Sequence, residues 1–435
     1  MGTKIEVQSL VAARASHVRY AVAAAIFLLA VISYVDRTCI SVSGPFLAAD
    51  LGLSSVQMGF VYGAFILSYG LFAVPGGLLG DRIGNRKVIT GLVLLFSLFT
   101  ALTGVVHALW SLVLVRFLFG AAESSVGSNS SRVIAKWLPP SRWGLAQGSM
   151  WMSGRIGGAF APGLVVGLAP LLGWRGGFYF FAAIGCIWAA LFWFWFRDNP
   201  EEKGGVTEEE LRIIRDKEGF SPSAHTLVKL PWGSLLRSRV MWTICGMYFC
   251  FSYGWHFYMT WFPTYMKAQG FSTAQIGLLG GLPYFFGAFG CVAGGLLTDY
   301  VVKTTGSVRN RRYIGCVGFL LMALCMFLVA GMHNAMACVL TISMASFFGD
   351  LTLSSCWAVC MDVGHEYAGT ITGIMSTSGN IGGFLFPVVS GFLVQSTGSW
   401  KVPILVSGTI FLIGSMLWLK VDSRQSVLKP ATPAG

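Results

Sequence analysis

"GLSSVQMG", residues 52–59, reappears almost unchanged as "GFSTAQIG", residues 270–277. Downstream, "GGLLGD" at 76–81 reappears as "GGLLTD" at 294–299, and both pairs are offset by the same 218 positions. Chance matches would not keep both their order and their spacing. The chain therefore consists of two copies of one unit, and the segments around these motifs indicate what that unit is.

The composition excludes most soluble proteins. Of the 435 residues, 55% are hydrophobic and only 11% are charged, whereas soluble domains carry about 25% charged residues. The mean hydropathy is +0.68. The ten cysteines lie in apolar segments without CxxC spacing, so neither a disulfide framework nor a zinc site is predicted. We expect a membrane protein without a metal or an organic cofactor.

Apolar runs long enough to cross a bilayer recur along the chain, and each is a candidate membrane helix. Twelve such runs occur: 18–42, 56–79, 88–106, 109–134, 144–168, 175–196, 240–265, 274–299, 313–331, 336–360, 368–393 and 402–420. The first run holds Asp36 and Arg37 and is followed by no small-residue cleavage site, which is not typical of a signal peptide. The predicted fold is an all-α membrane protein with twelve transmembrane helices.

The positive charges predict how these helices are oriented. With the N-terminus inside, the cytoplasmic segments contain most of the lysines and arginines, and the outer loops contain only Arg175, Lys267 and Lys401. This asymmetry predicts a multi-pass protein of the inner (plasma) membrane with both termini in the cytoplasm. It also explains the net charge of +12 without a nucleic-acid partner.

The duplicated unit has six helices. We expect an N-terminal half at 1–197, a cytoplasmic linker with a short surface helix at 198–238, a C-terminal half at 239–421 and a cytoplasmic tail at 422–435. In the linker, Thr207 and Glu210 have the spacing of a capping box. An even number of crossings makes the two halves parallel, as in transporters that alternate access around a site between their repeats.

The loop "GLLGDRIGNRK", residues 77–87, resembles the signature between helices two and three of the major facilitator superfamily. Asn85 departs from that pattern, in which a basic residue is usual. The resemblance implies a gating loop whose glycines allow close approach and whose charges latch the cytoplasmic side by pairing with the opposing half. The residues concerned are Gly77, Asp81, Arg82, Gly84 and Arg86. An ordinary polar loop is the alternative.

A narrower resemblance is carried by "YVDR" at 34–37, "RFLFGAAES" at 116–124, "KWLPPSRWGLAQG" at 136–148 and "WAVCMDVG" at 357–364. Together these motifs are similar to the anion:cation symporter family, which includes hexuronate, galactonate and phthalate permeases and vesicular sialic-acid and glutamate carriers. The similarity covers nearly the whole chain. Trp143 departs from it, because relatives often have arginine there.

Six ionisable residues other than histidine lie inside the predicted spans: Asp36, Arg37, Arg116, Glu123, Arg155 and Asp350. A charge at the centre of a membrane helix costs about 2.5–3.5 kcal/mol on insertion scales. Arginine supplies a permanent cation with a planar fork for a carboxylate, which suits substrate binding by Arg37 and by Arg155. A carboxylate can carry a coupling proton, and the family resemblance implies proton-coupling and anion-binding roles for Asp36, Arg37 and Glu123.

Structural ion pairs are the alternative for all six residues, and we favour that role for Arg116 and Asp350. Glu123 has no basic neighbour one turn away on its own helix. We therefore expect its charge to be poorly compensated, which suits proton exchange.

The repeat adds further positions to the candidate site. Aligning "SYVDR" with "SYGWH" puts His256 opposite Arg37, and aligning "SGRIGGAFAP" with "SGNIGGFLFP" puts Asn380 opposite Arg155. We expect His256 and Asn380 to contact substrate, with plain packing as the alternative for His256. Tyr69 matches a ligand-facing tyrosine of the family pattern.

The predicted function is proton-coupled uptake of a small organic anion by alternating access. The substrate is expected to be a sugar acid or an aromatic or aliphatic carboxylate, and the protein is expected to act as a monomer in the lipid bilayer. Alternatives are an organic-anion or organophosphate exchanger and an efflux pump of the same fold. An enzyme is not expected, because the six histidines are scattered and form no metal or nucleophile cluster in the sequence.

Overall fold

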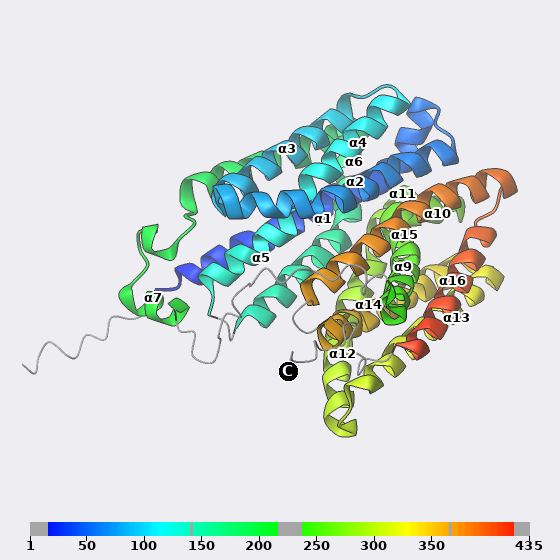
Figure 1. The fold of residues 1–435 in the computed structure, drawn as a ribbon. Coiled ribbons are helices and arrows are strands. Elements are labelled where there is room, and N and C mark those ends of the chain that lie inside the picture. Colours follow the sequence, from blue (N-terminus) through cyan, green and yellow to red (C-terminus); the bar gives the residue numbers. More distant parts are fainter. Residues whose placement is uncertain (1–15, 140–141, 216–236, 365–367, 422–435) are drawn as a thin grey trace, which may run out of the picture.

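The computed structural model describes residues 16–139, 142–215, 237–364 and 368–421, and every regular element in these ranges is helical (Figure 1). The N-terminal half contains α1 (Val18–Leu51), α2 (Ser55–Ile83), α3 (Asn85–Val105), α4 (Leu109–Glu123), α5 (Val126–Trp137) and α6 (Trp143–Trp195). The C-terminal half contains α9 (Arg239–Thr260), α10 (Phe262–Ala268), α11 (Thr273–Leu279), α12 (Leu282–Thr305), α13 (Arg311–Gly331), α14 (Ala335–Gly364), α15 (Ala368–Thr397) and α16 (Lys401–Lys420). The prediction of an all-α fold is confirmed.

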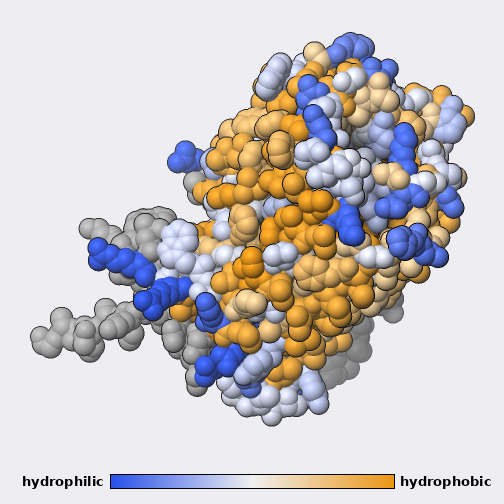
Figure 2. Space-filling view, turned by 90° about the vertical axis from the view of Figure 1, so that its right-hand side faces the viewer, coloured by the Kyte–Doolittle hydropathy of each residue, from blue (hydrophilic) through white to orange (hydrophobic). Residues whose placement is uncertain are grey.

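Ten described helical segments are long and apolar enough to cross a membrane. One of them, α6, has 53 residues and leaves helical geometry at Gly173 (φ 65°, ψ 174°), so it contains two of the predicted spans. α9 and α10 are not among the ten, but together they occupy the place of the predicted seventh span. The described helices thus account for all twelve predicted spans. Hydrophobic side chains cover most of the surface in Figure 2, and hydrophilic ones gather toward its margins.

The motif that defines the two copies builds the same turn twice. Gly52 has a left-handed backbone (φ 62°), which glycine adopts without strain. Ser54 then caps α2, because its hydroxyl accepts from the Gln57 N–H and the Gln57 side chain accepts from the Ser54 N–H at 2.8 Å. The second copy forms the same capping box before α11 with Gly270, Ser272 and Gln275.

Three predicted spans are interrupted, which hydropathy did not indicate. The fourth breaks between α4 and α5, where the Ser124 hydroxyl donates to the Ala121 carbonyl. Such bonds compete with the helix ladder and bend helices. The seventh and eighth predicted spans break beside Pro263 and Pro283, respectively. Proline lacks the N–H that a continuous helix needs.

The linker helix α7 (Glu208–Arg215) docks on the beginning of α1. The Thr207 hydroxyl accepts from the Glu210 N–H at 3.3 Å, as predicted. The reciprocal half of the capping box is wrong, because the Glu210 carboxylate accepts instead from the Arg19 backbone N–H (3.0 Å) and from the Ser16 hydroxyl. The first N–H groups of α1 lack helical partners and favour a negative group.

The two halves meet where α15 packs on α2 and where α11 and α12 pack on α6. We call the end of the molecule that carries α7 the linker face, and the end that carries Gly52 and Gly270 the far face. Glycines let the halves approach closely toward the far face. A Cβ atom at Gly59 would lie 2.5 Å from the carbonyl oxygen of Pro387, and one at Gly281 would overlap the carbonyl oxygen of Ala159.

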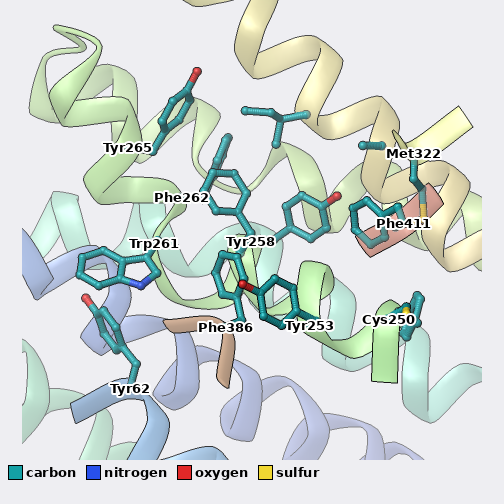
Figure 3. Close-up of a cluster of buried hydrophobic side chains, with 14 of the residues drawn as sticks. Tyr62, Cys250, Tyr253, Tyr258, Trp261, Phe262, Tyr265, Met322, Phe386 and Phe411 are labelled. Carbon is teal, nitrogen blue, oxygen red and sulfur yellow. The ribbon is translucent and has the colours of Figure 1, made fainter. Parts of the chain in front are cut away.

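Side chains complete this seal at the far face. Tyr62 of α2 meets Trp261 edge to face, with ring centroids 5.2 Å apart (Figure 3). The Ser41 hydroxyl of α1 donates to the carbonyl of Thr260 at 2.9 Å. Polar and aromatic contacts thus reinforce the close packing of the glycines.

Toward the linker face the helices of the two halves separate. The last glycine of α2 that lies against the other half is Gly70, where an added Cβ would meet Asn380. Beyond it, Leu71 of α2 is 59% exposed, and Leu145 near the beginning of α6 is 65% exposed. In Figure 1, α5 and α12 diverge in this direction. The described halves therefore lie together at the far face and apart at the linker face.

Candidate substrate site

Arg37 and Glu123 form a buried ion pair inside the N-terminal half. Arg37 Nε lies 2.8 Å from Glu123 Oε1, and the Glu123 side chain is completely buried. The interpretation that Glu123 is poorly compensated is wrong, because its cation comes from α1 rather than from its own helix. This bond uses Nε of Arg37, so the Nη groups face other acceptors, among them the Tyr69 side chain.

Two tyrosines hold the Arg37 guanidinium in place. Its Cζ lies 4.7 Å from the ring centroid of Tyr69 and 5.1 Å from that of Tyr34. Such cation–π contacts contribute about 0.5–2 kcal/mol each. Tyr69 was predicted at the site. Tyr34 was not, although it begins the "YVDR" motif and lies nearly one helical turn before Arg37.

Asp36 lies in a separate environment, because adjacent helix residues point about 100° apart. It is 1% exposed, and its carboxylate has only the Thr100 side chain within loose hydrogen-bonding range. Glu123 and Arg116 are its charged neighbours within electrostatic range. Arg116 stacks on Phe119, with its Cζ 4.5 Å from the ring centroid. A buried carboxylate that is so weakly hydrogen-bonded is costly while charged, so Asp36 suits proton uptake.

A second buried ion pair joins the two halves. Arg155 Nη2 of α6 lies 2.6 Å from Asp350 Oδ1 of α14, and both side chains are at most 9% exposed. No spacing pattern pairs these two residues, and they were expected to have separate roles. Among the ion pairs of the described residues, this is the one that connects different halves.

Aromatic side chains of both halves surround the two arginines. The Trp255 ring centroid lies 4.6 Å from Arg155 Cζ, and Trp255 meets Tyr284 at 6.3 Å between ring centroids. Tyr34 lies within electrostatic range of both Arg37 and Arg155. Sequence reasoning missed Trp255 and Tyr284, because aromatic residues in membrane spans are usually plain packing.

The two positions taken from the repeat both lie between the halves. His256 is 9% exposed, its Nδ1 lies 2.7 Å from the Ser252 carbonyl oxygen, and Arg37 is within electrostatic range. Asn380 packs on α2 at Gly70, where an added Cβ would lie 2.9 Å from the Asn380 Cβ. Their contact with substrate stays a prediction.

The predicted gating loop ties together elements of its own half. Arg86 Nε donates to the Trp193 carbonyl near the end of α6 at 2.8 Å, and its backbone N–H donates to Asp198 at 2.9 Å. Gly84 has a φ of 87°, and its missing side chain leaves room for the Asp198 carboxylate. The loop is therefore held firmly against α6.

The remaining residues of that loop leave the latch untested. The Gly77 carbonyl accepts from Arg132 of α5, again within one half. Arg82 is exposed, and the side chain of Asp81 lies outside the described residues. Pairing of this loop with the opposing half stays a prediction.

The comparison with protein families settles the class of the protein. The model of the Major Facilitator Superfamily matches residues 26–387. The chain belongs to the major facilitator superfamily. It is therefore a multi-pass integral membrane transporter and not an enzyme. The predicted resemblance to this superfamily and the predicted membrane fold are confirmed. No group of three or more metal-ligating side chains occurs in the described part of this transporter.

Curated relatives and solved structures agree with this family. The chain is 33% identical to the probable sulfoacetate transporter of Cupriavidus necator, a match that covers 96% of the chain and 97% of that protein. It is 29% identical to the hexuronate transporter of Bacillus subtilis, covering 93% and 95%, and 30% identical to the probable galactarate/D-glucarate transporter of Escherichia coli, covering 95% and 96%. A bacterial homolog of the human lysosomal transporter Spinster, in its inward-facing and occupied conformation, shares the fold, with a TM-score of 0.76, 18% identity, and 95% and 99% of the two chains covered.

Proposed function

We propose that this transporter couples proton entry to the uptake of a small organic anion, such as a sugar acid or a short aliphatic or aromatic carboxylate. The observation that carries the proposal is two buried arginines, Arg37 inside the N-terminal half and Arg155 where the halves meet, each beside a buried carboxylate. The relatives support the substrate class, because their names refer to sulfoacetate, hexuronate and galactarate or glucarate.

The proposed orientation identifies the side to which the described conformation opens. The excess of lysine and arginine near the linker face makes that face cytoplasmic, with both termini on the same side. The described conformation, with the halves apart at the linker face, is then open to the cytoplasm. A single chain contains both repeats around the site, so the monomer is the proposed transport unit.

Charge balance explains why a proton accompanies the anion. Arg37 is already neutralised by Glu123. A substrate carboxylate that binds the Nη side of Arg37 adds a second negative charge beside one cation. A proton on Glu123 or on Asp36 restores neutrality. The halves can then close around a neutral occupied site at lower electrostatic cost than around a charged one. Binding of the anion and binding of the proton therefore favour each other.

Anion exchange is the second candidate, and the same ion pair favours it. If Glu123 remains bonded to Arg37 throughout the cycle, one substrate anion can replace another without net proton movement. Exchange then requires no acid–base step at Asp36 or Glu123. Only a driven-accumulation measurement separates the two functions.

The test uses the purified chain in proteoliposomes. Sulfoacetate, D-glucarate, D-glucuronate and D-galactonate are offered with an inward proton gradient, without a gradient, and in counterflow. We expect accumulation of at least one anion with the gradient, abolished by a protonophore. Counterflow without any response to the gradient would show an exchanger, and no transport of any of these anions would contradict the proposed substrate class.

A substitution then tests the binding role of Arg37. Arg37→Lys keeps the charge but loses the planar fork, so substrate affinity should fall at least tenfold, which is about 1.4 kcal/mol. Arg175→Lys is the matched control, because Arg175 pairs with Asp50 at the far face. Unchanged affinity in the Arg37→Lys protein, measured by equilibrium binding, would remove Arg37 from the site.

A further inference from the structure

The ion pair between the halves leaves hydrogen-bonding groups unused. Arg155 donates to Asp350 through Nη2, while its Nη1 and the Oδ2 of Asp350 have no partner in the described part of the chain. Arg155 is only 7% exposed, so this donor lies deep inside the molecule. The Nε1 of Trp255, whose ring stacks on the guanidinium, is also buried without a partner. Apart from the thiol of Cys291, a weak acceptor that lies beside Arg155, no described group accepts from these two neighbouring donors.

Buried donors without acceptors are uncommon in native structures and call for an explanation. Oxygens of a carboxylate or a sulfonate fit both donors, and a guanidinium binds such groups in a forked geometry. This place is close to the first anion position, because Tyr34 and Tyr284 each lie within electrostatic range of both Arg37 and Arg155. Binding at both positions requires that one small molecule with an acidic group at each end contacts both arginines.

We infer that Arg155 binds the second acidic group of a dianionic substrate, and that Asp350 then leaves Arg155 and takes up a proton. The inference rests on the proposed function, in which Arg37 binds the first acidic group. The substrate class is a dicarboxylate, or a carboxylate that also carries a sulfonate. The Arg155–Asp350 ion pair breaks and the pair between Arg155 and the incoming oxyanion forms. The proton comes from the outer solution as hydronium, which protonates the Asp350 carboxylate and leaves as water.

The surroundings of Asp350 explain why it needs that proton. Its other titratable neighbours are Tyr34 of α1, Tyr258 of α9 and Cys291 of α12. None of these carries a positive charge, so no described cation replaces Arg155. Removing one partner of a buried ion pair leaves an uncompensated charge, which is strongly unfavourable. After the halves move, the substrate and the proton leave to the cytoplasm and the ion pair re-forms.

This arrangement ties the number of protons to the charge of the substrate. Three arginines and three carboxylates balance one another when all are ionised: Asp36, Arg37, Arg116, Glu123, Arg155 and Asp350. A monoanion adds one negative charge, which a proton on Asp36 or Glu123 cancels. A dianion adds two, and Asp350 supplies the second proton site. The Arg155–Asp350 ion pair also joins the two halves. Only a dianion breaks this ion pair, because only a dianion has a second acidic group for Arg155.

The test compares two acids with the same carbon skeleton, D-glucarate with two carboxylates and D-gluconate with one. The pair sulfoacetate and acetate provides a second comparison of the same kind. The proton-to-substrate ratio is measured from reversal potentials in proteoliposomes for the wild-type chain, Asp350→Asn and Asp362→Asn. Asp362 is the matched control, since it pairs with Arg311 away from the site. Equilibrium affinities are measured for the same proteins and for the double variant Arg155→Gln with Asp350→Asn.

We expect the wild-type ratio to be one proton higher for D-glucarate than for D-gluconate. Asp350→Asn should lower the D-glucarate ratio by one and leave the D-gluconate ratio unchanged, and Asp362→Asn should change neither. The double variant removes both charges and leaves no lone buried ion. Its affinity for D-glucarate should fall at least tenfold, while its affinity for D-gluconate stays within about twofold.

Equal wild-type ratios for both acids would overturn the inference, as would an unchanged D-glucarate ratio in Asp350→Asn. If that variant does not transport, the double variant decides by binding alone, and equal loss of affinity for both acids overturns the role of Arg155. Binding of monoanions but of neither dianion would overturn it as well. By contrast, transport that ignores the proton gradient for every anion contradicts the proposed function, and the selectivity of the double variant still decides the role of Arg155.

Discussion

The far face and the linker face of this transporter are held by different forces. At the far face backbone meets backbone, as where Gly281 lies against the carbonyl of Ala159. Near the linker face, described charged side chains bind within their own half, as Arg86 does with the carbonyl of Trp193. Close packing therefore holds the two halves together toward the far face. Near the linker face, the bonds of charged side chains hold each half together internally.

A seal made by shape can open without breaking an ion pair, and small residues let helices of membrane proteins pack and separate in this way. The described ion pair that does connect the halves, Arg155 with Asp350, lies between the two ends. The ion pair between the halves thus lies where a charged ligand can break it. Each of the following variants tests one part of this division between shape and charge.

The largest effect is expected from the buried charge inside the N-terminal half. Glu123→Gln imitates the protonated acid permanently, so the variant should not accumulate substrate when the outside is acidified. It should still bind substrate and still exchange labelled for unlabelled substrate, because neither step needs net proton movement. Proteoliposome uptake with and without a proton gradient, followed by counterflow, measures both properties.

Two results would change the role given to this residue. Full proton-driven accumulation by Glu123→Gln would exclude Glu123 as an essential proton carrier. Loss of exchange together with accumulation would instead indicate that Glu123 mainly positions Arg37, to which it is bonded at 2.8 Å. The control is Glu209→Gln, since Glu209 lies on α7 and its side chain is 48% exposed.

A smaller loss is expected when the seal at the far face is overfilled. The Cβ of Gly281→Ala would overlap the carbonyl oxygen of Ala159, and overpacking costs about 1–3 kcal/mol. The conformation closed at the far face should lose population, and transport should slow by about ten- to a hundredfold. Gly295→Ala on the same helix is the matched control, because its Cβ would lie 3.8 Å from the nearest atom. Equal rates for the two variants would show that this contact does not limit closure.

The sequence predicted the repeated features better than the contacts between distant residues. The two copies of the opening motif lie at equivalent turns, and each forms the same capping box through Ser54 or Ser272. Such local bonds can be read from spacing alone. The Arg155–Asp350 pair joins residues 195 positions apart, and no spacing rule indicates which of three acids an arginine will meet.

The helix breaks and the linker contacts were missed for a related reason. Pro263 lies among apolar residues, so hydropathy does not mark that break, and the polar run that begins at Ser124 lies inside a span that is apolar over its length as a whole. The capping box of α7 was half wrong because a competing donor, the N–H of Arg19, comes from a helix 191 residues away in sequence. Local rules give the bonds that a segment can make, and tertiary packing decides which bonds form.

The smallest effect is expected from the linker, where charge fastens α7 to α1. The Glu210 carboxylate is completely buried and accepts from the Arg19 N–H at 3.0 Å, at the positive end of the α1 dipole. Glu210→Gln keeps one acceptor but removes the charge, which also pairs with the buried Arg19 guanidinium at 3.5 Å. The loss of that pair adds to a dipole contribution of about 0.3–1 kcal/mol, so the Tm of the detergent-solubilised protein should fall. Transport should stay within about twofold of wild type, because each half keeps its own internal contacts. Glu209→Gln again serves as the control, since Glu209 pairs only with Arg212 on its own helix at 3.6 Å among the described ion pairs. A large loss of transport by Glu210→Gln with an unchanged Tm would show that the linker takes part in closing the linker face, and the division between shape and charge would then fail at that end.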